Sequence, residues 1–382
     1  MGALRLCFVG PASSVSLRRW VEWFACRGHD TTIITVEPAE TPLVEKFLQI
    51  DVGMSLGPRK FSRLVSAARM ALTVRRLKPD LLHVHYVRGL AWGLLLNRFH
   101  PCVVTPWGSD VLGEQGAFRE SYSRRLTRAV LRMADLVTVH SEYMETQVRA
   151  LLTSARPVAR IGWGVDLRLF RPGLDVRALR VRWGIGEDQR VIFSPRLTQP
   201  FYNHDRILRA IPTVCEKIPE VLLVIAEQHA DQGYVTGLRR LALDLGVAER
   251  VKFVGSIPYQ DMPLWYNLAR AVVMVPQSDG MPNSLLEAMA CGAVPVLNRL
   301  PQYAEMIRHG ENGFLVDPEQ GDLAGPLVGV LSDAGAREHI ARRNLEKVKE
   351  VADQEREMSR MESFYDQLVS AGRGRRVVLS RR

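Results

Sequence analysis

The sequence has few cysteines, and none of their spacings is typical of a metal site. Its five cysteines are scattered over 382 residues and are odd in number, which predicts free thiols in a reducing compartment. The first residues lack the long apolar segment of a signal peptide, and no run approaches the roughly 18 apolar residues that cross a bilayer. We therefore expect a cytoplasmic protein without membrane-spanning helices.

Acidic residues are scarce in the first part of the chain. The net charge is +10, and residues 1–165 hold 22 Lys and Arg against 13 Asp and Glu. No known nucleic-acid-binding motif accompanies this charge, so nucleic acid is not the expected partner. Residues 59–132 hold 14 basic and four acidic side chains, concentrated in amphipathic stretches at 61–76 and 121–133. Solvated helix faces would explain them, but we expect contact with an anionic membrane surface on its inner, cytoplasmic side.

Short apolar runs alternate with amphipathic stretches along the chain, which predicts parallel βα units. The length and the 47% hydrophobic composition allow two domains. A linker near residues 170–173 divides the pattern into Rossmann-like domains at 1–168 and 174–352, and a basic tail at 373–382 is expected to be disordered. Strands are predicted at 4–9, 31–36, 81–84, 103–105, 136–139, 158–161, 191–194, 221–226, 251–254, 271–275, 294–297 and 313–316; helices of the first domain are predicted at 17–26, 61–77, 89–98, 118–133 and 144–151.

The stretch 278–292 is the most informative feature of the sequence. It places Asp279, a glycine, a proline and an asparagine ahead of an apolar helix that carries Glu287, and it follows an apolar run that indicates a buried strand. Ligands of parallel sheets sit at this carboxyl end of the strands. The backbone N–H groups of Met281, Asn283 and Ser284, with the positive end of the helix dipole, predict a seat for an anion.

The two acids near this seat would repel a phosphate, so they are better suited to accept hydrogen bonds from hydroxyl groups. An anion seat flanked by hydroxyl acceptors is typical of a nucleotide-sugar site. The alternative is a capping Asp or Asn and a surface Glu on an ordinary helix.

The whole stretch 278–292, with Gly310-Glu-Asn-Gly313 and Leu315-Val-Asp-Pro318, resembles the retaining glycosyltransferases of family 4, which have the GT-B fold. The resemblance extends to residues 10–20 and 161–172, and so covers most of the chain. It implies an α/β protein of two Rossmann-like domains whose parallel sheets face across a cleft. The N-terminal domain would bind the acceptor and the C-terminal domain the nucleotide sugar. A last helix, expected over about 353–371, would cross back to the N-terminal domain.

In that family a Glu–seven residues–Glu pair marks the donor site. By position, Glu287 matches the acid that binds the ribose hydroxyls, and Asp279 matches the acid that contacts the transferred sugar, with a side chain one methylene shorter. The resemblance also places Gly280 in the donor-binding loop and Glu305 beside the donor, although a surface helix Glu is the alternative for Glu305.

Arg196 follows a predicted strand, where its guanidinium could bind diphosphate through two parallel hydrogen bonds. The family carries an Arg at this position, whereas an isolated arginine would more simply be a solvated surface residue. The Lys that commonly follows in the family is missing here, and Asn203 is expected to assist the donor by hydrogen bonding.

Other candidates lie in the first domain. Gly10, Ser13 and Ser14 belong to a turn after the first strand, which is either a phosphate-binding loop facing the cleft or a plain turn. Trp107 occupies a region where many relatives carry a His that faces the reacting sugar. Asp110 is either a general base for the acceptor hydroxyl or the cap of the next turn.

His83 and His85 alternate along a predicted strand and therefore share one of its faces. A metal pair is conceivable, but no third ligand is apparent in the sequence. Core or cleft-edge histidines whose hydrogen bonds are satisfied are the expectation.

The sequence thus predicts a retaining, metal-independent glycosyltransferase without a cofactor. It would transfer a sugar from an NDP-sugar to a lipid-linked or oligosaccharide acceptor in cell-surface polysaccharide or glycolipid synthesis. No Asp-x-Asp pair, through which many glycosyltransferases hold a metal, occurs in the chain, so Arg196 and the helix end are expected to stabilise the leaving diphosphate. The alternatives are an NDP-sugar epimerase, a phosphorylase, or a non-catalytic protein that binds a sugar nucleotide or a lipid.

Overall fold

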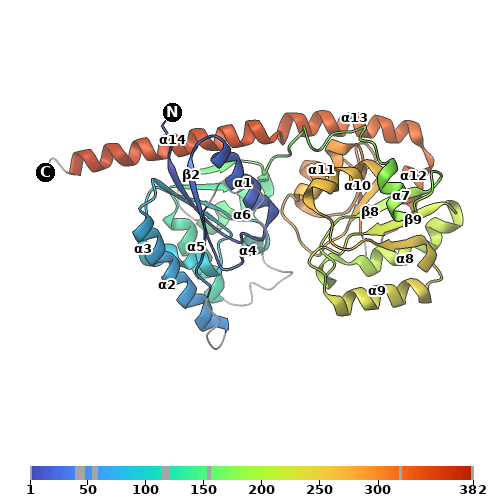
Figure 1. The fold of residues 1–382 in the computed structure, drawn as a ribbon, viewed down its shortest axis with the longest axis horizontal. Coiled ribbons are helices and arrows are strands. Elements are labelled where there is room, and N and C mark those ends of the chain that lie inside the picture. Colours follow the sequence, from blue (N-terminus) through green and yellow to red (C-terminus); the bar gives the residue numbers. More distant parts are fainter. Residues whose placement is uncertain are drawn as a thin grey trace. The chain divides into compact units, whose positions relative to one another are not determined.

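Two parallel β-sheets form the framework of the protein, one in each of two units (Figure 1). The computed structural model describes residues 2–38, 48–53, 59–112, 121–152, 156–317 and 321–379, and the structural statements below refer to these residues. Unit 1 comprises Met1–Trp163 and Glu355–Arg382, and unit 2 comprises Gly164–Gln354.

Unit 1 contains a seven-stranded sheet in the order β3-β2-β1-β4-β5-β6-β7. Val9, at the end of β1, pairs with Ile34 of β2 and with Val84 of β4, and all neighbours run parallel. The strand order reverses between β1 and β4, as in doubly wound α/β folds. The strands are β1 (Arg5–Val9), β2 (Asp30–Thr35), β3 (Leu48–Asp51), β4 (Leu81–His85), β5 (Cys102–Thr105), β6 (Leu136–Val139) and β7 (Val158–Arg160).

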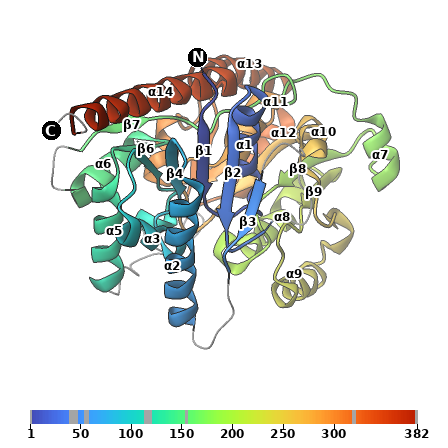
Figure 2. The same ribbon diagram turned by 60° about the vertical axis from the view of Figure 1, so that its left-hand side comes forward.

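Helices cover both faces of this sheet, and each face has its own buried core (Figure 2). Side chains of α1 and α14 pack on one face around Phe8 and Trp20, while side chains of α2, α3, α5 and α6 pack on the other. The helices are α1 (Val15–Cys26), α2 (Arg59–Leu77), η1 (Gly89–Trp92), α3 (Gly93–Asn97), α4 (Ser109–Leu112), α5 (Ser121–Met133), α6 (Glu142–Leu152) and α14 (Gln354–Leu379).

Helix α14 returns to unit 1 after the chain has formed unit 2. Its Met358, Met361 and Tyr365 are fully buried against the sheet. Glu362 pairs with Arg27 and His29, both at 3.0 Å. The crossing helix implied by the resemblance is therefore present. The expectation of a disordered tail from residue 373 is wrong as far as Leu379, because α14 continues through most of that segment.

Unit 2 contains a six-stranded parallel sheet in the order β10-β9-β8-β11-β12-β13. Val272 of β11 pairs with Phe193 of β8 on one side and with Pro295 of β12 on the other. One face packs against α7, α10, α11 and α13, and the other against α8, α9 and α12. The strands are β8 (Arg190–Ser194), β9 (Val221–Ile225), β10 (Val251–Phe253), β11 (Ala269–Met274), β12 (Val294–Asn298) and β13 (Phe314–Val316).

The helical segments of unit 2 are α7 (Arg177–Trp183), η2 (Pro200–Tyr202), α8 (His204–Lys217), α9 (Gln232–Asp244), η3 (Ala248–Arg250), η4 (Tyr259–Asp261), α10 (Met262–Leu268), α11 (Asn283–Cys291), η5 (Pro301–Glu305), α12 (Ala324–Ser332) and α13 (Ala334–Val351). No helix in the described ranges is both long enough and apolar enough to span a bilayer.

Two chain segments pair where unit 2 begins and ends. The backbone N–H of Val165 donates to the carbonyl of Ala352 at 2.7 Å, and that of Gln354 donates to Val165 at 3.1 Å. Gly164 lies beside this pair with a φ of +72°, and a Cβ added there would approach the Gln354 Cα to 2.5 Å. Only glycine fits both the conformation and the space.

Candidate active site

The candidate site of unit 2 lies at the carboxyl edge of its sheet, around the point where the strand order reverses. This point is between β8 and β11, and ligands of doubly wound sheets bind at such positions. Arg196 follows β8, the loop 275–282 follows β11, and η5 follows β12. Three adjacent strands therefore deliver the side chains of the site to one edge.

Arg196 joins the two sides of this reversal point. Its Nη2 atom lies 2.8 Å from Oδ2 of Asp279, and its Nη1 donates to Oγ of Ser284 at 3.0 Å. Both members of the ion pair are largely buried, with side-chain exposures of 16% and 13%. Burial is the largest single influence and lowers the pKa of Arg196, but the Asp279 charge together with Tyr202 and Tyr303 raises it above its usual value, so the guanidinium stays charged. A cation is thus fixed at the amino end of α11.

Asp279 is also held from η5. Tyr303 donates its hydroxyl to Oδ2 of Asp279 at 2.9 Å, and the side-chain amide of Gln302 donates to the Asp279 carbonyl. The backbone N–H of Gly280 donates to Oδ1 at 2.9 Å. Burial raises the pKa of Asp279, and Arg196 and Tyr303 oppose that shift by stabilising the carboxylate. Asp279 therefore holds Arg196 in place at the same position from which it was expected to contact a sugar.

The loop after β8 supports Arg196 from the other side. The Arg196 guanidinium lies over the Tyr202 ring, 5.0 Å from its centroid. Asn203 has a left-handed backbone conformation, is 9% exposed, and donates through Nδ2 to the Val275 carbonyl at 2.8 Å. Asn203 therefore connects this loop to the residue that follows β11.

Helix α11 supplies the other elements of the expected donor site. It begins at Asn283 after an extended Pro282 and has no acidic residue in its first turn, so its positive end is not neutralised there. Met281 is buried, and Glu287 lies one turn into the helix at 5% exposure, where its Oε2 accepts from the Tyr266 hydroxyl at 3.3 Å. Glu305, at the end of η5, is half-buried.

The turn after β1 uses its backbone N–H groups within unit 1. The amides of Gly10, Ser13 and Ser14 donate to the carbonyls of Ile34, Glu37 and Pro11, respectively, at 3.0–3.1 Å. The amide of Ala12 donates to Oγ1 of Thr35 at 3.1 Å. This geometry favours the plain turn over the phosphate-binding loop. A Cβ added at Gly10 would lie 2.9 Å from the tip of Leu17 and 3.3 Å from the carbonyl oxygen of His85, so the turn is tightly packed there.

Asp110 is fully buried in the first turn of α4, the short helix that follows β5. Its Oδ2 accepts the backbone N–H of Val87 at 2.8 Å, and its Oδ1 accepts those of Trp107 and Gly108 at 2.9 Å. Burial raises the pKa of Asp110, and the three amides oppose the shift. Of the two alternatives, this arrangement is that of a cap, because both oxygens already serve the surrounding backbone.

Histidines and tryptophans form a buried cluster at the carboxyl edge of the unit 1 sheet. His83 is hydrogen-bonded to Tyr365 and, at 2.6 Å, to Thr105. His85 stacks on Trp163 and accepts weakly from Trp107 at 3.5 Å. Among the described residues no group of three or more His, Cys, Asp or Glu could hold a metal ion. The pair therefore has the environment of core histidines.

This cluster predicts a stability loss in mild acid. Burial lowers the pKa of His85 to about 3, with His140 adding to the shift. In the unfolded chain the imidazole of His85 is protonated near pH 6.5, whereas in the folded protein it stays neutral. Below that pH the unfolded state therefore binds more protons, and the free energy of unfolding falls as the pH falls. Replacing His85 with Phe should reduce this slope by about 0.7 kcal/mol per pH unit at pH 6.5, rising to about 1.3 kcal/mol per pH unit near pH 5. Denaturant unfolding at several pH values measures this slope. If the free energy of unfolding depended on pH in the same way for His85→Phe and for the exposed control His339→Gln, the assignment of the slope to His85 would be contradicted.

Comparisons with known proteins agree with both units. The glycosyl transferases group 1 profile matches residues 175–347, and the glycosyl transferase 4-like profile matches residues 5–141. A D-inositol 3-phosphate glycosyltransferase 2 of Catenulispora acidiphila is 32% identical over 292 residues, which cover 69% of this chain and 67% of the relative. The chain belongs to glycosyltransferase family 4.

A second relative of this glycosyltransferase is a GDP-mannose-dependent alpha-(1-6)-phosphatidylinositol monomannoside mannosyltransferase of Mycolicibacterium smegmatis. It is 30% identical over 217 residues, 55% of this chain, and the match spans only 56% of the relative's length. Among solved structures, sucrose-phosphate synthase of Thermosynechococcus elongatus has a TM-score of 0.83 at 20% identity, covering 96% of this chain and 99% of the other. Anabaena HepE with UDP-glucose has a TM-score of 0.79 at 19% identity, covering 96% and 100%. These likenesses confirm the GT-B fold.

Several residues of the candidate site were not expected from the sequence. They are side chains that hold the expected residues: Tyr202, Tyr266, Gln302 and Tyr303. A signal was available for two of them, because Gln302 and Tyr303 follow β12 just as Arg196 follows β8.

Proposed function

We propose that the chain is a retaining glycosyltransferase that binds an NDP-sugar in unit 2 and an acceptor in unit 1. The observation that carries the proposal is the fixed cation at the amino end of α11, with the buried carboxylate of Glu287 one turn further along. Arg196, Ser284 and the first amides of α11 suit a diphosphate. Glu287 suits the two hydroxyls of a ribose.

The proposed chemistry is a front-face substitution. The bond between the anomeric carbon and the diphosphate oxygen breaks, and the acceptor hydroxyl bonds to that carbon from the same side. The hydroxyl proton passes to the departing phosphate, so no protein carboxylate acts as a covalent nucleophile. Arg196 and the helix end stabilise the charge that develops on the NDP, which is the role a metal has in other glycosyltransferases. Asp279 and Glu305 are proposed to lie beside the transferred sugar.

A thermal-shift screen tests the donor. GDP- and UDP-sugars are the first candidates, because one relative is GDP-mannose-dependent and HepE was crystallised with UDP-glucose. A ligand at 100 times its Kd stabilises a protein by about 2.7 kcal/mol, which gives a clear upward shift of Tm. We expect one nucleotide series to stabilise the chain selectively, and stabilisation by none of the UDP-, GDP- or ADP-sugars would contradict the proposal.

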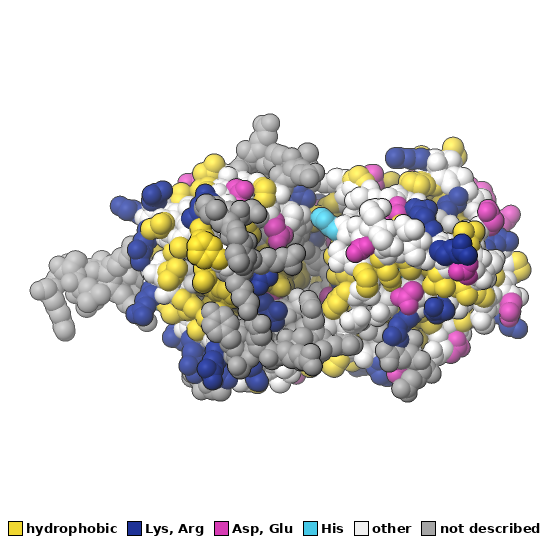
Figure 3. All heavy atoms as spheres, turned by 90° about the horizontal axis from the view of Figure 1, so that it is seen from below, with side chains coloured by type: hydrophobic (Ala, Val, Ile, Leu, Met, Phe, Trp, Pro, Cys, Tyr) yellow, Lys and Arg dark blue, Asp and Glu magenta, His cyan; other side chains and the backbone are white. Residues whose placement is uncertain are grey.

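A lipid-linked or glycan acceptor at a membrane surface is proposed from the surface of unit 1. Helix α2 buries Ala67, Met70, Ala71 and Val74, yet a second apolar stripe faces solvent, where Phe61, Leu64 and Leu72 are 54%, 53% and 50% exposed. The arginines exposed on α2 and α5 are Arg63, Arg75, Arg76, Arg124, Arg125 and Arg132. Figure 3 shows hydrophobic and basic side chains gathered on this face of unit 1. Apolar side chains ringed by arginine suit an anionic lipid surface.

Liposome flotation tests this surface. Replacing Phe61, Leu64 and Leu72 with Ser should abolish flotation with anionic vesicles, since each buried apolar side chain contributes about 1.5–3 kcal/mol. Flotation of the wild-type chain should also fall with salt, because each juxtamembrane charge contributes about 1 kcal/mol. The control is Val181→Ser on α7 of unit 2, where Val181 is 83% exposed. Equal flotation with neutral vesicles would contradict the preference for anionic lipid, and flotation of the triple variant equal to that of the wild-type chain would contradict membrane contact through α2.

A further inference from the structure

The first half of helix η5 is hydrogen-bonded to the loop 275–282, which carries Asp279. Gln302 is 2% exposed and Tyr303 is fully buried. Both donate to Asp279, Gln302 to its carbonyl and Tyr303 to its carboxylate at 2.9 Å. Because Asp279 in turn holds Arg196 at 2.8 Å, the position of η5 determines where the guanidinium sits relative to α11.

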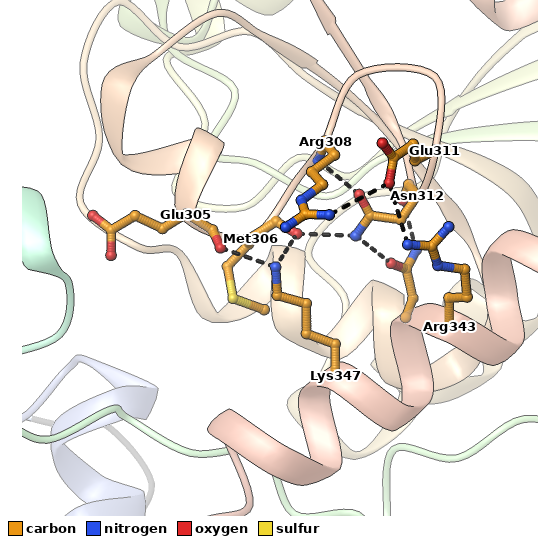
Figure 4. A network of polar contacts seen from close by, with 8 residues as sticks. Glu305, Met306, Arg308, Glu311, Asn312, Arg343 and Lys347 are labelled. Atoms are coloured by element: carbon orange, nitrogen blue, oxygen red, sulfur yellow. Dashed lines mark hydrogen bonds and ion pairs between the residues drawn. The ribbon is translucent and has the colours of Figure 1, made fainter.

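The second half of η5 is hydrogen-bonded to a side chain of α13. The Nζ atom of Lys347 donates to the carbonyl oxygens of Glu305 and Met306, both at 2.9 Å. Figure 4 shows the lysine reaching from α13 to these carbonyls, while the Glu305 carboxylate points away from the contact network. Lys347 therefore fixes the backbone where η5 ends.

A pair of buried asparagines holds the chain just beyond η5. Asn312 donates through Nδ2 to the Met306 carbonyl and to Oδ1 of Asn344, both at 2.9 Å, and accepts the backbone N–H of Arg308 at 2.7 Å. Asn344 lies on α13, one turn before Lys347, and donates to the Asn312 carbonyl at 2.9 Å. Both side chains are nearly or fully inaccessible to solvent. Asn312 and Lys347 share the Met306 carbonyl, and Lys347 also bonds the carbonyl of Glu305, the last residue of η5.

The placement of Lys347 costs free energy unless its carbonyl contacts offset it. The side chain is half-buried; burial lowers its pKa, and Arg308 and Arg343 lower it further. Glu350 and Glu305 are the acids that oppose this shift. A lysine that served only as a polar surface residue of α13 would lose free energy by this burial. Here the two hydrogen bonds to carbonyl oxygens are charge-assisted and strong, so they offset that loss.

We propose that Lys347 is a positioning residue of the donor site, which acts through η5 to hold Asp279, and through it Arg196, at the amino end of α11. The inference rests on the proposed function, because it concerns the same donor site. It predicts that a residue remote from the guanidinium controls how well the diphosphate is bound and stabilised.

Lys347→Met tests the proposal by keeping the length of the side chain and removing its ammonium. We expect kcat/KM for the donor to fall about tenfold, as for the loss of a charge-assisted hydrogen bond, and Lys347→Arg to restore most of it. Hydrogen exchange of the substrate-free chain should show faster exchange at the amides of 302–307. The matched control is Lys349→Met, an exposed lysine on the same helix, for which neither readout should change.

A double variant separates positioning from general stability. Tyr303→Phe also loosens Asp279 from η5, so combining it with Lys347→Met should cost less than the product of the single effects. Independent effects of the two substitutions, or unchanged exchange at 302–307, would overturn the proposal. A wild-type chain that binds no nucleotide sugar would refute the proposed function, whereas a wild-type chain and a Lys347→Met variant that bind the donor equally well would refute this inference alone.

Discussion

Replacing Arg196 with Met should lower kcat by about 10²–10³-fold, because the proposed leaving diphosphate would lose the guanidinium that Asp279 fixes at the amino end of α11. The chain lacks the Lys that commonly follows this Arg in the family, so no second cation of that kind would help to stabilise the charge on the diphosphate. Arg196→Lys should retain part of the rate, since it keeps a charge but cannot bridge Asp279, Ser284 and a phosphate at once. Initial rates at saturating donor measure the effect.

Two controls make this result specific. Arg209 is an exposed arginine on α8, and Arg209→Met should leave kcat unchanged. Turnover of the wild-type chain should persist in EDTA, since the proposed leaving-group stabilisation needs no metal. A kcat for Arg196→Met within about threefold of wild type would remove Arg196 from the mechanism, because one donor of this kind is worth far more.

Replacing Glu287 with Gln is expected to raise the Kd for the NDP-sugar by about 10- to 100-fold. Glu287 is 5% exposed, and the amide keeps its shape while losing the charge that strengthens bonds to ribose hydroxyls. Isothermal calorimetry measures the change. The Tyr266 hydroxyl donates to Glu287, so Tyr266→Phe should leave the carboxylate less firmly positioned. We expect a loss of affinity smaller than that of Glu287→Gln.

A nucleotide without ribose hydroxyls sharpens this test. The wild-type chain should bind a 2′,3′-dideoxy nucleotide less tightly than the normal one, by about the factor lost in Glu287→Gln. Glu287→Gln should bind the two nucleotides with similar affinity, because the interaction between the carboxylate and the ribose hydroxyls is already lost in this variant. Equal discrimination by the variant and the wild-type chain would show that Glu287 does not contact the ribose.

The sheets were predictable because parallel strands are buried on both faces and therefore appear as apolar runs. The predicted run 221–226 lies within one residue of β9, and 136–139 coincides with β6. β3 was missed because Leu48-Gln-Ile-Asp51 is a short, partly exposed edge strand with alternating polarity. The extent of α14 was underestimated because a run of basic residues was taken as a tail, although arginine is a good helix former.

The candidate site was predictable only where sequence position fixes it. Arg196 and Asp279 follow β8 and β11, and adjacent parallel strands bring their carboxyl ends together. That Asp279 would itself hold Arg196 depends on side-chain rotamers, which spacing does not determine. The amides after β1 looked available in sequence, but residues at and just after the end of β2, and Pro11 within the turn, accept their hydrogen bonds.

The most direct measurement is a crystal structure of the chain with its NDP-sugar. We expect a diphosphate within hydrogen-bonding distance of the Arg196 guanidinium and the first amides of α11, and a ribose whose hydroxyls contact Glu287. A nucleotide sugar bound elsewhere on the chain, with this edge of the unit 2 sheet empty, would contradict it.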